Sequence, residues 1–548
     1  MVDLARGLKP IAFVLAAAIA AAGCSKVQSG AAPTSGGVPG VVRIVGFGSN
    51  DSLIPELSAS ASSIDVGQFW AAWFFQVSEQ GDLEPELATE VPTPQNGGVS
   101  RDGLTITYHL RNGVTWQDGA PFTAADAIFT WHLIMDPRNN VLTREGYDDI
   151  ASMTAPDPYT LRVRLKKPYA PAIATFFGPS LQPMPVLPEH LLKGLPDINH
   201  ATYNNRPVGT GPFYVDTFEP GTKIVLKPNP HYWRGAPKLS EVDFLVVIDP
   251  NTQTTMMRTG EADLYYDPGN SQVAELQTIP GVHINRETFN EYWYLIMNER
   301  HPPLDDVRVR RAISMATDRA YVARTVMHGL ATPAQTDQPP FSWAFDPNVH
   351  QAAFDPAGAR RVLDAAGWKL GPDGYRSKHG TELTLVLATG TTWEDARKFA
   401  PVFQSMMQSV GIRVQIKFYP TSILEGSAGS GGVINNGRFD LAYTGWIAGV
   451  DPDDDALWAC DQMPPAGWNQ AFACDPRIDA EEHIALTQYD RATRRAAYWR
   501  IQELLAQDVP VIFMYYADRD DAVRDGFENY RPAPAVTEFW NTYQWQMH

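Results

Sequence analysis

The sequence predicts an α/β protein of two or three domains, in which mixed sheets are flanked by helices. A chain of 548 residues is too long for one ordinary hydrophobic core. Residues 383–388, 396–410 and 412–418 read in turn as a strand, an amphipathic helix and a second strand. Elements in this order and at this spacing form a βαβ unit, which predicts a parallel sheet. Residues 104–110 alternate apolar and polar side chains, which is typical of a half-buried strand.

Residues 102–137 carry the most detailed local prediction. The strand within them is followed by Asn112-Gly113 and Asp118-Gly119, pairs that supply the positive φ a tight hairpin turn needs. Thr123 is followed three residues later by Asp126, which resembles a capping box at the start of a helix. The apolar side chains that share one face of this helix are Ala124, Ile128, Trp131 and Met135. Asp136-Pro137 ends it.

The same stretch, read as L-R-N-G and then W-x-D-G-x-P-F-T-A-x-D, resembles the signature of the family 5 extracellular solute-binding proteins. These are the dipeptide- and oligopeptide-binding components of bacterial ABC importers. Residues 207–215 (PVGTGPFYV) and 304–317 (LDDVRVRRAISMAT) match further segments of the family, and the resemblance covers essentially the whole mature chain. It implies a two-lobed periplasmic-binding-protein-like fold, type II, of the large peptide-binder class with an extra subdomain.

The resemblance also implies a division of the chain. The expected segments are a lipoprotein signal peptide at 1–23, a flexible tether at 24–40, lobe I at 41–75, 206–298 and 506–548, the extra subdomain at 76–205, and lobe II at 299–505.

The N-terminus predicts export and a lipid anchor. Arg6 and Lys9 precede a short apolar run at 11–22, which is too short to span a bilayer. The run ends in Ala-Ala-Gly-Cys at Cys24, which resembles the lipobox of bacterial lipoproteins, although an ordinary signal peptide containing a cysteine is the alternative. Residues 25–40 are rich in Ser, Gly and Pro and cannot pack a core. We therefore expect a periplasmic or cell-surface protein held at the membrane through Cys24.

Composition and cysteine usage limit the kinds of partner and cofactor that can be expected. A net charge of −18 argues against nucleic acid, whose phosphates demand a basic surface. Cys460 and Cys474, an even pair in an exported chain, predict a disulfide. Two thiols without a C-x-x-C motif or clustered His do not make a zinc site. We expect a monomer with no metal and no cofactor.

The ligand site is expected near Gly445-Trp446. In the family, a buried aspartate after the G-W motif holds the α-amino group of the ligand, but Gly449 stands at that position here. Asp451 could substitute for it, or the ligand could lack a free α-amine. The candidate ligand-binding residues are Tyr294, Asn298, Tyr443, Trp446, Asp451 and Trp540. Asp451, with the acidic run at 453–455, fails the calcium-binding EF-hand pattern, and these carboxylates are expected to face water.

No catalytic motif accompanies this site. A G-x-S-x-G elbow, an H-E-x-x-H helix and a phosphate-binding P-loop are all missing from the sequence. The sequence therefore favours capture without chemistry, in which hinge closure encloses a peptide-like ligand for delivery to an ABC permease. An oligosaccharide or a metal chelate as the ligand, and a lipid-anchored cell-envelope enzyme, are the alternatives.

Overall fold

A computed structural model describes residues 37–548, except 47, 49, 51, 59, 145, 181 and 536. The predicted signal peptide, Cys24 and residues 25–36 of the tether lie outside the described residues. Within the described part of the chain, no helix combines the length and the apolar character needed to cross a bilayer.

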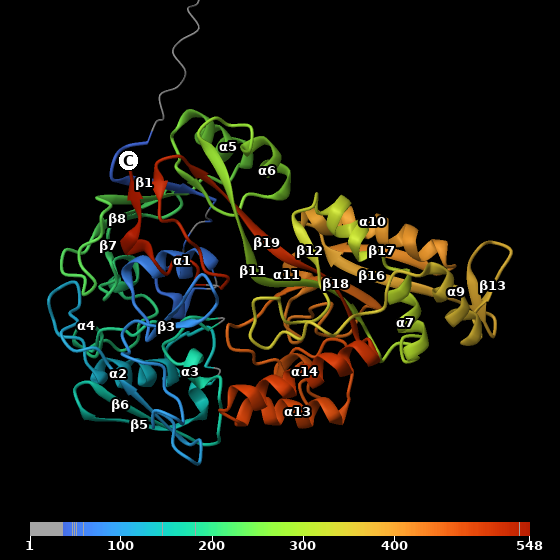
Figure 1. The fold of residues 1–548 in the computed structure, drawn as a ribbon, viewed down its shortest axis with the longest axis horizontal. Coiled ribbons are helices and arrows are strands. Elements are labelled where there is room, and N and C mark those ends of the chain that lie inside the picture. Colours follow the sequence, from blue (N-terminus) through green and yellow to red (C-terminus); the bar gives the residue numbers. More distant parts are fainter. Residues whose placement is uncertain are drawn as a thin grey trace, which may run out of the picture.

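One sheet runs through both lobes of the molecule (Figure 1). Its strands follow the order β17-β16-β18-β11-β19-β10-β1-β9-β8-β7, with β12 paired to β19. We call the end that carries β10, β1, β9, β8 and β7 lobe I, and the end that carries β17, β16 and β18 lobe II. The predicted βαβ unit is confirmed in lobe II, because β16 and β17 pair in parallel and helix α10 connects them.

Two long antiparallel strands join the lobes. They are β11 (Val282–Met297) and β19 (Val511–Arg524), and each has one half in either lobe. Their register shifts between Thr288 and Tyr292, where three residues of β11 bulge opposite Ala517 of β19. The bulge therefore interrupts the ladder between the two halves of these strands.

Lobe I and a subdomain attached to it have separate hydrophobic cores. The lobe I elements are β1 (Val41–Val45), α1 (Ala61–Trp70), β7 (Phe213–Glu219), β8 (Lys223–Pro228), β9 (Glu241–Leu245), α5 (Pro250–Thr259), β10 (Leu264–Tyr265), α6 (Asn270–Leu276), β20 (Phe527–Glu528) and β21 (Gln546–Met547). The subdomain elements are β2 (Phe75–Val77), β3 (Leu83–Pro85), β4 (Thr105–His109), α2 (Ala124–Met135), β5 (Ile150–Asp157), β6 (Thr160–Leu165), α3 (Ala172–Thr175) and α4 (Glu189–Leu192).

Lobe II places hydrophobic cores around its end of the sheet. Its elements are α7 (Val307–Ala316), α8 (Arg319–Tyr321), β12 (Ala331–Pro333), α9 (Pro356–Ala365), β13 (Lys369–Leu370), β14 (Arg376–Lys378), β15 (Thr381–Glu382), β16 (Thr384–Gly390), α10 (Glu394–Ser409), β17 (Arg413–Tyr419), α11 (Thr421–Leu424), β18 (Leu441–Ile447), α12 (Asp455–Trp458), α13 (Pro476–Thr487) and α14 (Arg491–Asp508). The exact domain boundaries given above stay a prediction.

The strand and helix predicted within residues 102–137 are confirmed as β4 and α2. The Thr123 hydroxyl caps the helix, and Asp126 accepts the Thr123 backbone N–H at 2.9 Å, which completes a capping box. Gly113 and Gly119 both have positive φ, as the turn residues require. The turn at Gly119 closes a tight hairpin, in which Thr115 bridges Pro121 and the Phe122 N–H donates to the Val114 carbonyl. The turn at Gly113 does not, because β4 pairs with β6 instead of with the segment that follows it.

Two sequence patterns are misleading. The aromatic run at 68–77 is typical of one buried helix, but α1 ends at Trp70 and β2 begins at Phe75. Every residue in that run is buried, so its apolar pattern has no period that separates helix from strand. The basic residues within 304–317 are typical of a solvated helix face, yet Arg310 is buried and donates to the backbone carbonyls of Leu304 and Asp508.

Candidate functional site: the seam between the lobes

The subdomain and lobe II touch each other directly. Tyr169 of the subdomain donates its hydroxyl to Asp453 Oδ2 of lobe II at 2.5 Å. The Tyr489 hydroxyl reaches back to the carbonyls of Gly103 and Tyr169, at 3.0 and 3.1 Å. The Ala170 N–H donates to the Leu486 carbonyl at the end of α13. These contacts hold the two lobes in a closed arrangement, with α13 and α14 beside the subdomain (Figure 1).

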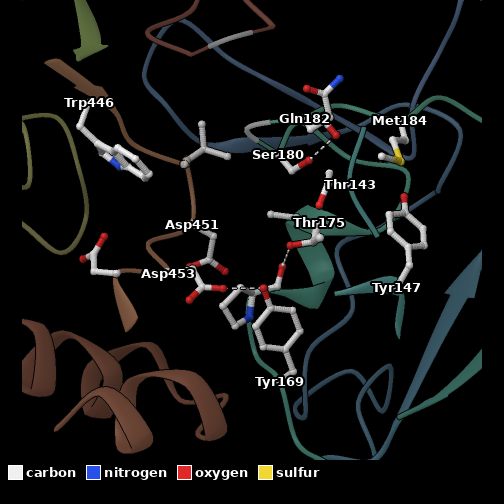
Figure 2. Close-up of a pocket in the computed structure, with 15 residues that line it drawn as sticks. Thr143, Tyr147, Tyr169, Thr175, Ser180, Gln182, Met184, Trp446, Asp451 and Asp453 are labelled. Carbon is white, nitrogen blue, oxygen red and sulfur yellow. Dashed lines mark hydrogen bonds between the residues drawn. The ribbon is translucent and has the colours of Figure 1, made fainter. Parts of the chain in front are cut away.

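A cavity of about 110 Å³ lies in this seam, and we call it the Trp446 cavity. Figure 2 shows Trp446, Asp451 and Asp453 of lobe II on one side of it and subdomain side chains on the other. Those labelled on the subdomain side are Thr143, Tyr147, Tyr169, Thr175, Ser180, Gln182 and Met184. Most of the subdomain wall is therefore uncharged, and its polar groups are hydroxyls and one carboxamide.

Two neighbouring cavities meet the same loop of lobe II. The Trp343 cavity, of about 550 Å³, is lined by Trp343, Arg491, Val450 and Asp451 and by apolar subdomain residues, among them Leu83 and Ile173. A smaller space of about 20 Å³, the Asn290 cavity, is lined by Asn290, Trp343 and Val450. Val450 lines all three cavities, and Asp451 lines both of the larger two. The loop at 449–451 is thus the common wall of the seam.

The carboxylate of Asp451 forms an ion pair with Arg494 of α14. Arg494 Nη2 lies 2.8 Å from Asp451 Oδ1, and Nη1 donates to Oδ2 at 3.1 Å. Arg494 is held further by the Ala485 carbonyl at 2.7 Å. Burial lowers the pKa of Arg494, but the Asp451 carboxylate more than offsets it, so that this pKa lies above its ordinary value. A buried charge of this kind is stable only because it is paired.

A family of known proteins matches the part of the chain that forms this seam. The family model for bacterial extracellular solute-binding proteins, family 5, matches residues 82–467, which is more than half of the chain. The chain belongs to the family 5 extracellular solute-binding proteins. The resemblance seen in the sequence is therefore confirmed, and it places the protein among the solute-binding proteins of ABC importers.

Relatives of this family 5 protein are similar along most of their length. Protein XP55 of Streptomyces lividans is 29% identical over 440 residues, covering 80% of this chain and 77% of XP55. The glutathione-binding protein GsiB of Escherichia coli O1:K1 / APEC is 28% identical over 473 residues, covering 86% of this chain and 88% of GsiB.

Solved structures share the two-lobed fold. Oligopeptide-binding AppA of Bacillus subtilis, in complex with a nonapeptide, has a TM-score of 0.74 at 22% identity and covers 93% of this chain and 99% of AppA. NikA of Brucella suis, in complex with Fe(III)-EDTA, has a TM-score of 0.79 at 23% identity and covers 93% of this chain and 100% of NikA. At these identities the likeness shows the fold alone.

The acidic run after Asp451 departs from the expectation that its carboxylates face water. Asp454 is buried, and it accepts a hydrogen bond from Gln338 Nε2 at 2.8 Å. Burial, together with the nearby Asp337 and Asp453, raises the pKa of Asp454 well above its usual range. Burial, together with repulsion by neighbouring carboxylates, raises the pKa of Asp455 to about 6. Within this run only Asp454 is buried, whereas Asp453 and Asp455 are half-buried.

A fourth cavity, of about 700 Å³, lies on the outer side of the Tyr169–Asp453 contact and is lined by six aspartates, one lysine and one histidine. The part of the chain that the structure describes contains no group of three or more His, Cys, Asp or Glu side chains placed to hold a metal ion. The wall of this cavity includes Gln462 and Trp468, which lie within the loop closed by the Cys460–Cys474 disulfide.

Three of the candidate ligand-binding residues lie elsewhere. Tyr443 is buried in a lobe II core, stacked on Phe399 with ring centroids 4.2 Å apart. Tyr294 is buried in the second lobe II core. Asn298 is fully buried and donates to the carbonyls of Gly437 and Phe439. All three belong to β11 and β18 or their ends, where side chains of a central sheet fill the cores on both of its faces.

The other three candidates stay at or near the seam. Trp446 and Asp451 line cavities, as described above. Trp540 of lobe I donates its indole N–H to the Arg531 carbonyl at 2.8 Å. It packs with Val450 against the small cluster of Val77, Ala533 and Ala535, so that an apolar contact crosses between the lobes there.

The sequence analysis missed Tyr169, Asn290, Trp343 and Arg494. They come from four segments that are distant in the chain, and only the fold brings them together at the 449–451 loop. The sequence could have indicated Trp343 as a candidate, because Phe341 and Trp343 are aromatic residues in a loop that follows Pro339-Pro340. Nothing in the local sequence distinguishes Arg494 from the other basic residues of its helix.

Proposed function

We propose that this protein is the lipid-anchored substrate-binding component of an ABC importer, and that it captures a peptide-like solute in the seam between its lobes by hinge closure. The observation that carries the proposal is the position of the cavities. The Trp446 and Trp343 cavities are each lined by the subdomain on one side and lobe II on the other. A solute bound there touches both sides only when the lobes are closed, so its binding shifts the population towards the closed state.

The hinge and the seam are mechanically connected in this proposal. The bulge of β11 between Thr288 and Tyr292 lies next to the Asn290 cavity, so a change of angle at the hinge opens or closes the site directly. The closed form would then be the form that the permease subunits accept. Cys24 would carry the lipid, and the 24–40 tether would give the lobes freedom to reach the permease.

The chemistry of the walls supports a peptide-like solute. Hydroxyls, one carboxamide and aromatic faces line the Trp446 cavity beside its three aspartates, and such uncharged groups bind a peptide backbone without reading each side chain. The binding of a nonapeptide by AppA and of glutathione by GsiB is consistent with this class of solute. The contacts proposed for this chain are Trp446, Asp451 and Trp540 from the sequence, with Tyr169, Asn290 and Trp343 from the structure.

Native mass spectrometry of the protein purified without denaturation tests this function. We expect a non-covalently bound peptide-like molecule, and we expect it to be recovered chemically intact after long incubation. An oligosaccharide or a metal chelate would keep the fold and the closure but overturn the solute class. A bound molecule that returns chemically changed would overturn the binding-protein function in favour of an enzyme.

A further inference from the structure

The Asp451 carboxylate already has a cationic partner inside the protein, although its Oδ1 accepts no hydrogen bond from a described residue. Asp451 lines both larger cavities, yet both of its carboxylate oxygens lie within 3.1 Å of the Arg494 guanidinium. Arg494 is 7% exposed in its side chain and Asp451 15%, so water screens the pair weakly. A solute ammonium that took Asp451 for itself would leave Arg494 buried without its counter-charge, which is strongly unfavourable.

The two other carboxylates of the Trp446 cavity are also engaged. Asp453 accepts the hydroxyl of Tyr169, and this contact is part of the closed seam. Asp454 accepts a hydrogen bond from Gln338 and is buried, and burial raises its pKa well above the usual range. An ammonium group entering this cavity would therefore have to break a bond that holds the lobes together or ionise a buried acid.

Asn290 offers a different kind of acceptor in the same place. It belongs to the bulge of β11 and is 2% exposed. Its side-chain Nδ2 donates to the Ala448 carbonyl at 2.5 Å, and its backbone carbonyl accepts the Ala448 N–H at 2.7 Å. The first bond fixes the orientation of the carboxamide, because a carbonyl oxygen can only face the NH₂ end.

The other end of that carboxamide is without a partner. Among the described residues, no donor bonds to Asn290 Oδ1, although the atom is buried. Asn290 lines the small cavity beside Trp343, whose 20 Å³ hold one water molecule or one donor group of a solute. A buried acceptor left unbonded is costly, so this atom needs a donor in the occupied state.

We propose that Asn290 Oδ1 accepts a hydrogen bond from an uncharged N–H group of the solute, and that the protein therefore selects solutes whose end at the 448–451 loop is an amide or a blocked amine. The proposal rests on the proposed function, of which it specifies the solute class. A neutral carboxamide satisfies an amide N–H fully, whereas it cannot compensate the desolvation of an ammonium. Arg494 is then a specificity-determining residue, because it holds the Asp451 carboxylate. Arg491 has the same role for Asp82, the carboxylate that lines the Asn290 cavity, and its guanidinium lies 3.8 Å from Asp82 Oδ1.

The test is a competition between two pools of mixed-sequence tripeptides, one with free amino termini and one N-acetylated. The full-length protein is stripped of retained solute in mild denaturant, refolded with its disulfide intact and incubated with equal amounts of both pools. Native mass spectrometry then gives the ratio of acetylated to free peptide bound. We expect the acetylated pool to be in at least a tenfold excess on the wild-type protein. The Asn290→Ala variant should lose about tenfold in affinity for the acetylated pool, since one hydrogen bond is removed.

A matched control is Asn285→Ala, on the same strand. Asn285 pairs with Asp521 within lobe I and lines none of the four cavities, so its replacement should leave the ratio unchanged. Preferential binding of the free-amine pool, or equal binding of both, would overturn this inference while leaving the proposed function standing. A ratio that Asn290→Ala does not alter would overturn the role of Asn290. Binding of neither pool by wild type would overturn both the inference and the peptide-like solute.

Discussion

Replacing Tyr169 by phenylalanine should weaken the closed state without harming either lobe. The change removes one hydroxyl, which donates to the Asp453 carboxylate across the seam at 2.5 Å. The backbone contacts of Tyr169 with Tyr489 are retained, because they use the main-chain N–H and carbonyl. The ring remains to fill the space that it fills in the wild-type protein. The substitution therefore removes the Tyr169–Asp453 hydrogen bond and keeps these backbone contacts and the ring.

The size of the effect follows from the type of bond. A hydrogen bond to a charged acceptor contributes about 1.5–3 kcal/mol, and ~1.4 kcal/mol corresponds to a factor of ten in an equilibrium constant. The ratio of closed to open protein should fall by roughly tenfold to a hundredfold. Small-angle X-ray scattering of the solute-free protein measures this as an increase in the radius of gyration. The free energy of unfolding of the individual lobes should change little.

Tyr159→Phe is the matched control, since Tyr159 belongs to the same subdomain and lines none of the cavities. It should scatter like wild type. If Tyr169→Phe and wild type have the same radius of gyration and bind solute with the same affinity, the seam contact does not hold the lobes closed, and the reasoning is refuted.

Three further predictions concern stability and anchoring. Glu56 is fully buried, no described residue bonds to its carboxyl oxygens, and burial raises its pKa to about 8. The folded state therefore keeps a proton that the unfolded state loses above pH ~4.5, so the free energy of unfolding falls as the pH rises from there towards 8. Glu56→Gln should remove this loss, so that its free energy of unfolding rises by about 3 kcal/mol relative to wild type between pH 4.5 and 7. Urea unfolding of both proteins at pH 5 and pH 7.5 measures it, and an equal difference at the two pH values would contradict the assignment. The disulfide joins Cys460 to Cys474. The double Cys→Ser variant should unfold about 3 kcal/mol more easily, and two thiols alkylated without reductant in the exported protein would disprove the bond. Finally, Cys24→Ala should move the protein from membranes to the soluble fraction, and a wild-type protein that is already soluble in the producing cell would contradict the anchor.

The local elements could be predicted because their signals lie within a few residues. The capping box at Thr123 and Asp126 and the alternation of residues 104–110 gave α2 and β4. The lengths of the hinge strands could not be predicted. The apolar runs at 292–298 and 510–516 are typical of strands, whereas β11 begins at Val282 and β19 ends at Arg524.

The missing halves of those strands contain charged residues that look solvent-exposed in a sequence. Arg519, for example, is buried in lobe I, where it lies 3.3 Å from Glu538 and its guanidinium carbon stands 3.8 Å from the Phe289 ring centroid. A partner that is distant in the chain makes such burial possible, and no local pattern reveals it.

The ligand site, too, could be predicted only where its residues share a local motif. The G-W motif led to Trp446 and Asp451 because the motif is local. It could not show that Arg494, which is 43 residues further along the chain, already neutralises Asp451. The aromatic residues Tyr294 and Tyr443 were attractive as walls because of their type, but their positions on central strands bury them in the cores. Loop residues such as Trp343 are exposed to the seam instead.

The distance between the lobes is the measurement that tests the central claim most directly. Spin labels at Arg101→Cys in the subdomain and Arg495→Cys in α14 occupy exposed positions on the two sides of the seam and line none of the cavities. Double electron–electron resonance on the solute-free protein should give a broad distribution that includes an open population. Saturation with the tripeptides that bind should narrow it to one shorter distance, because closure is coupled to capture. A distribution that is the same with and without bound peptide would contradict capture by hinge closure.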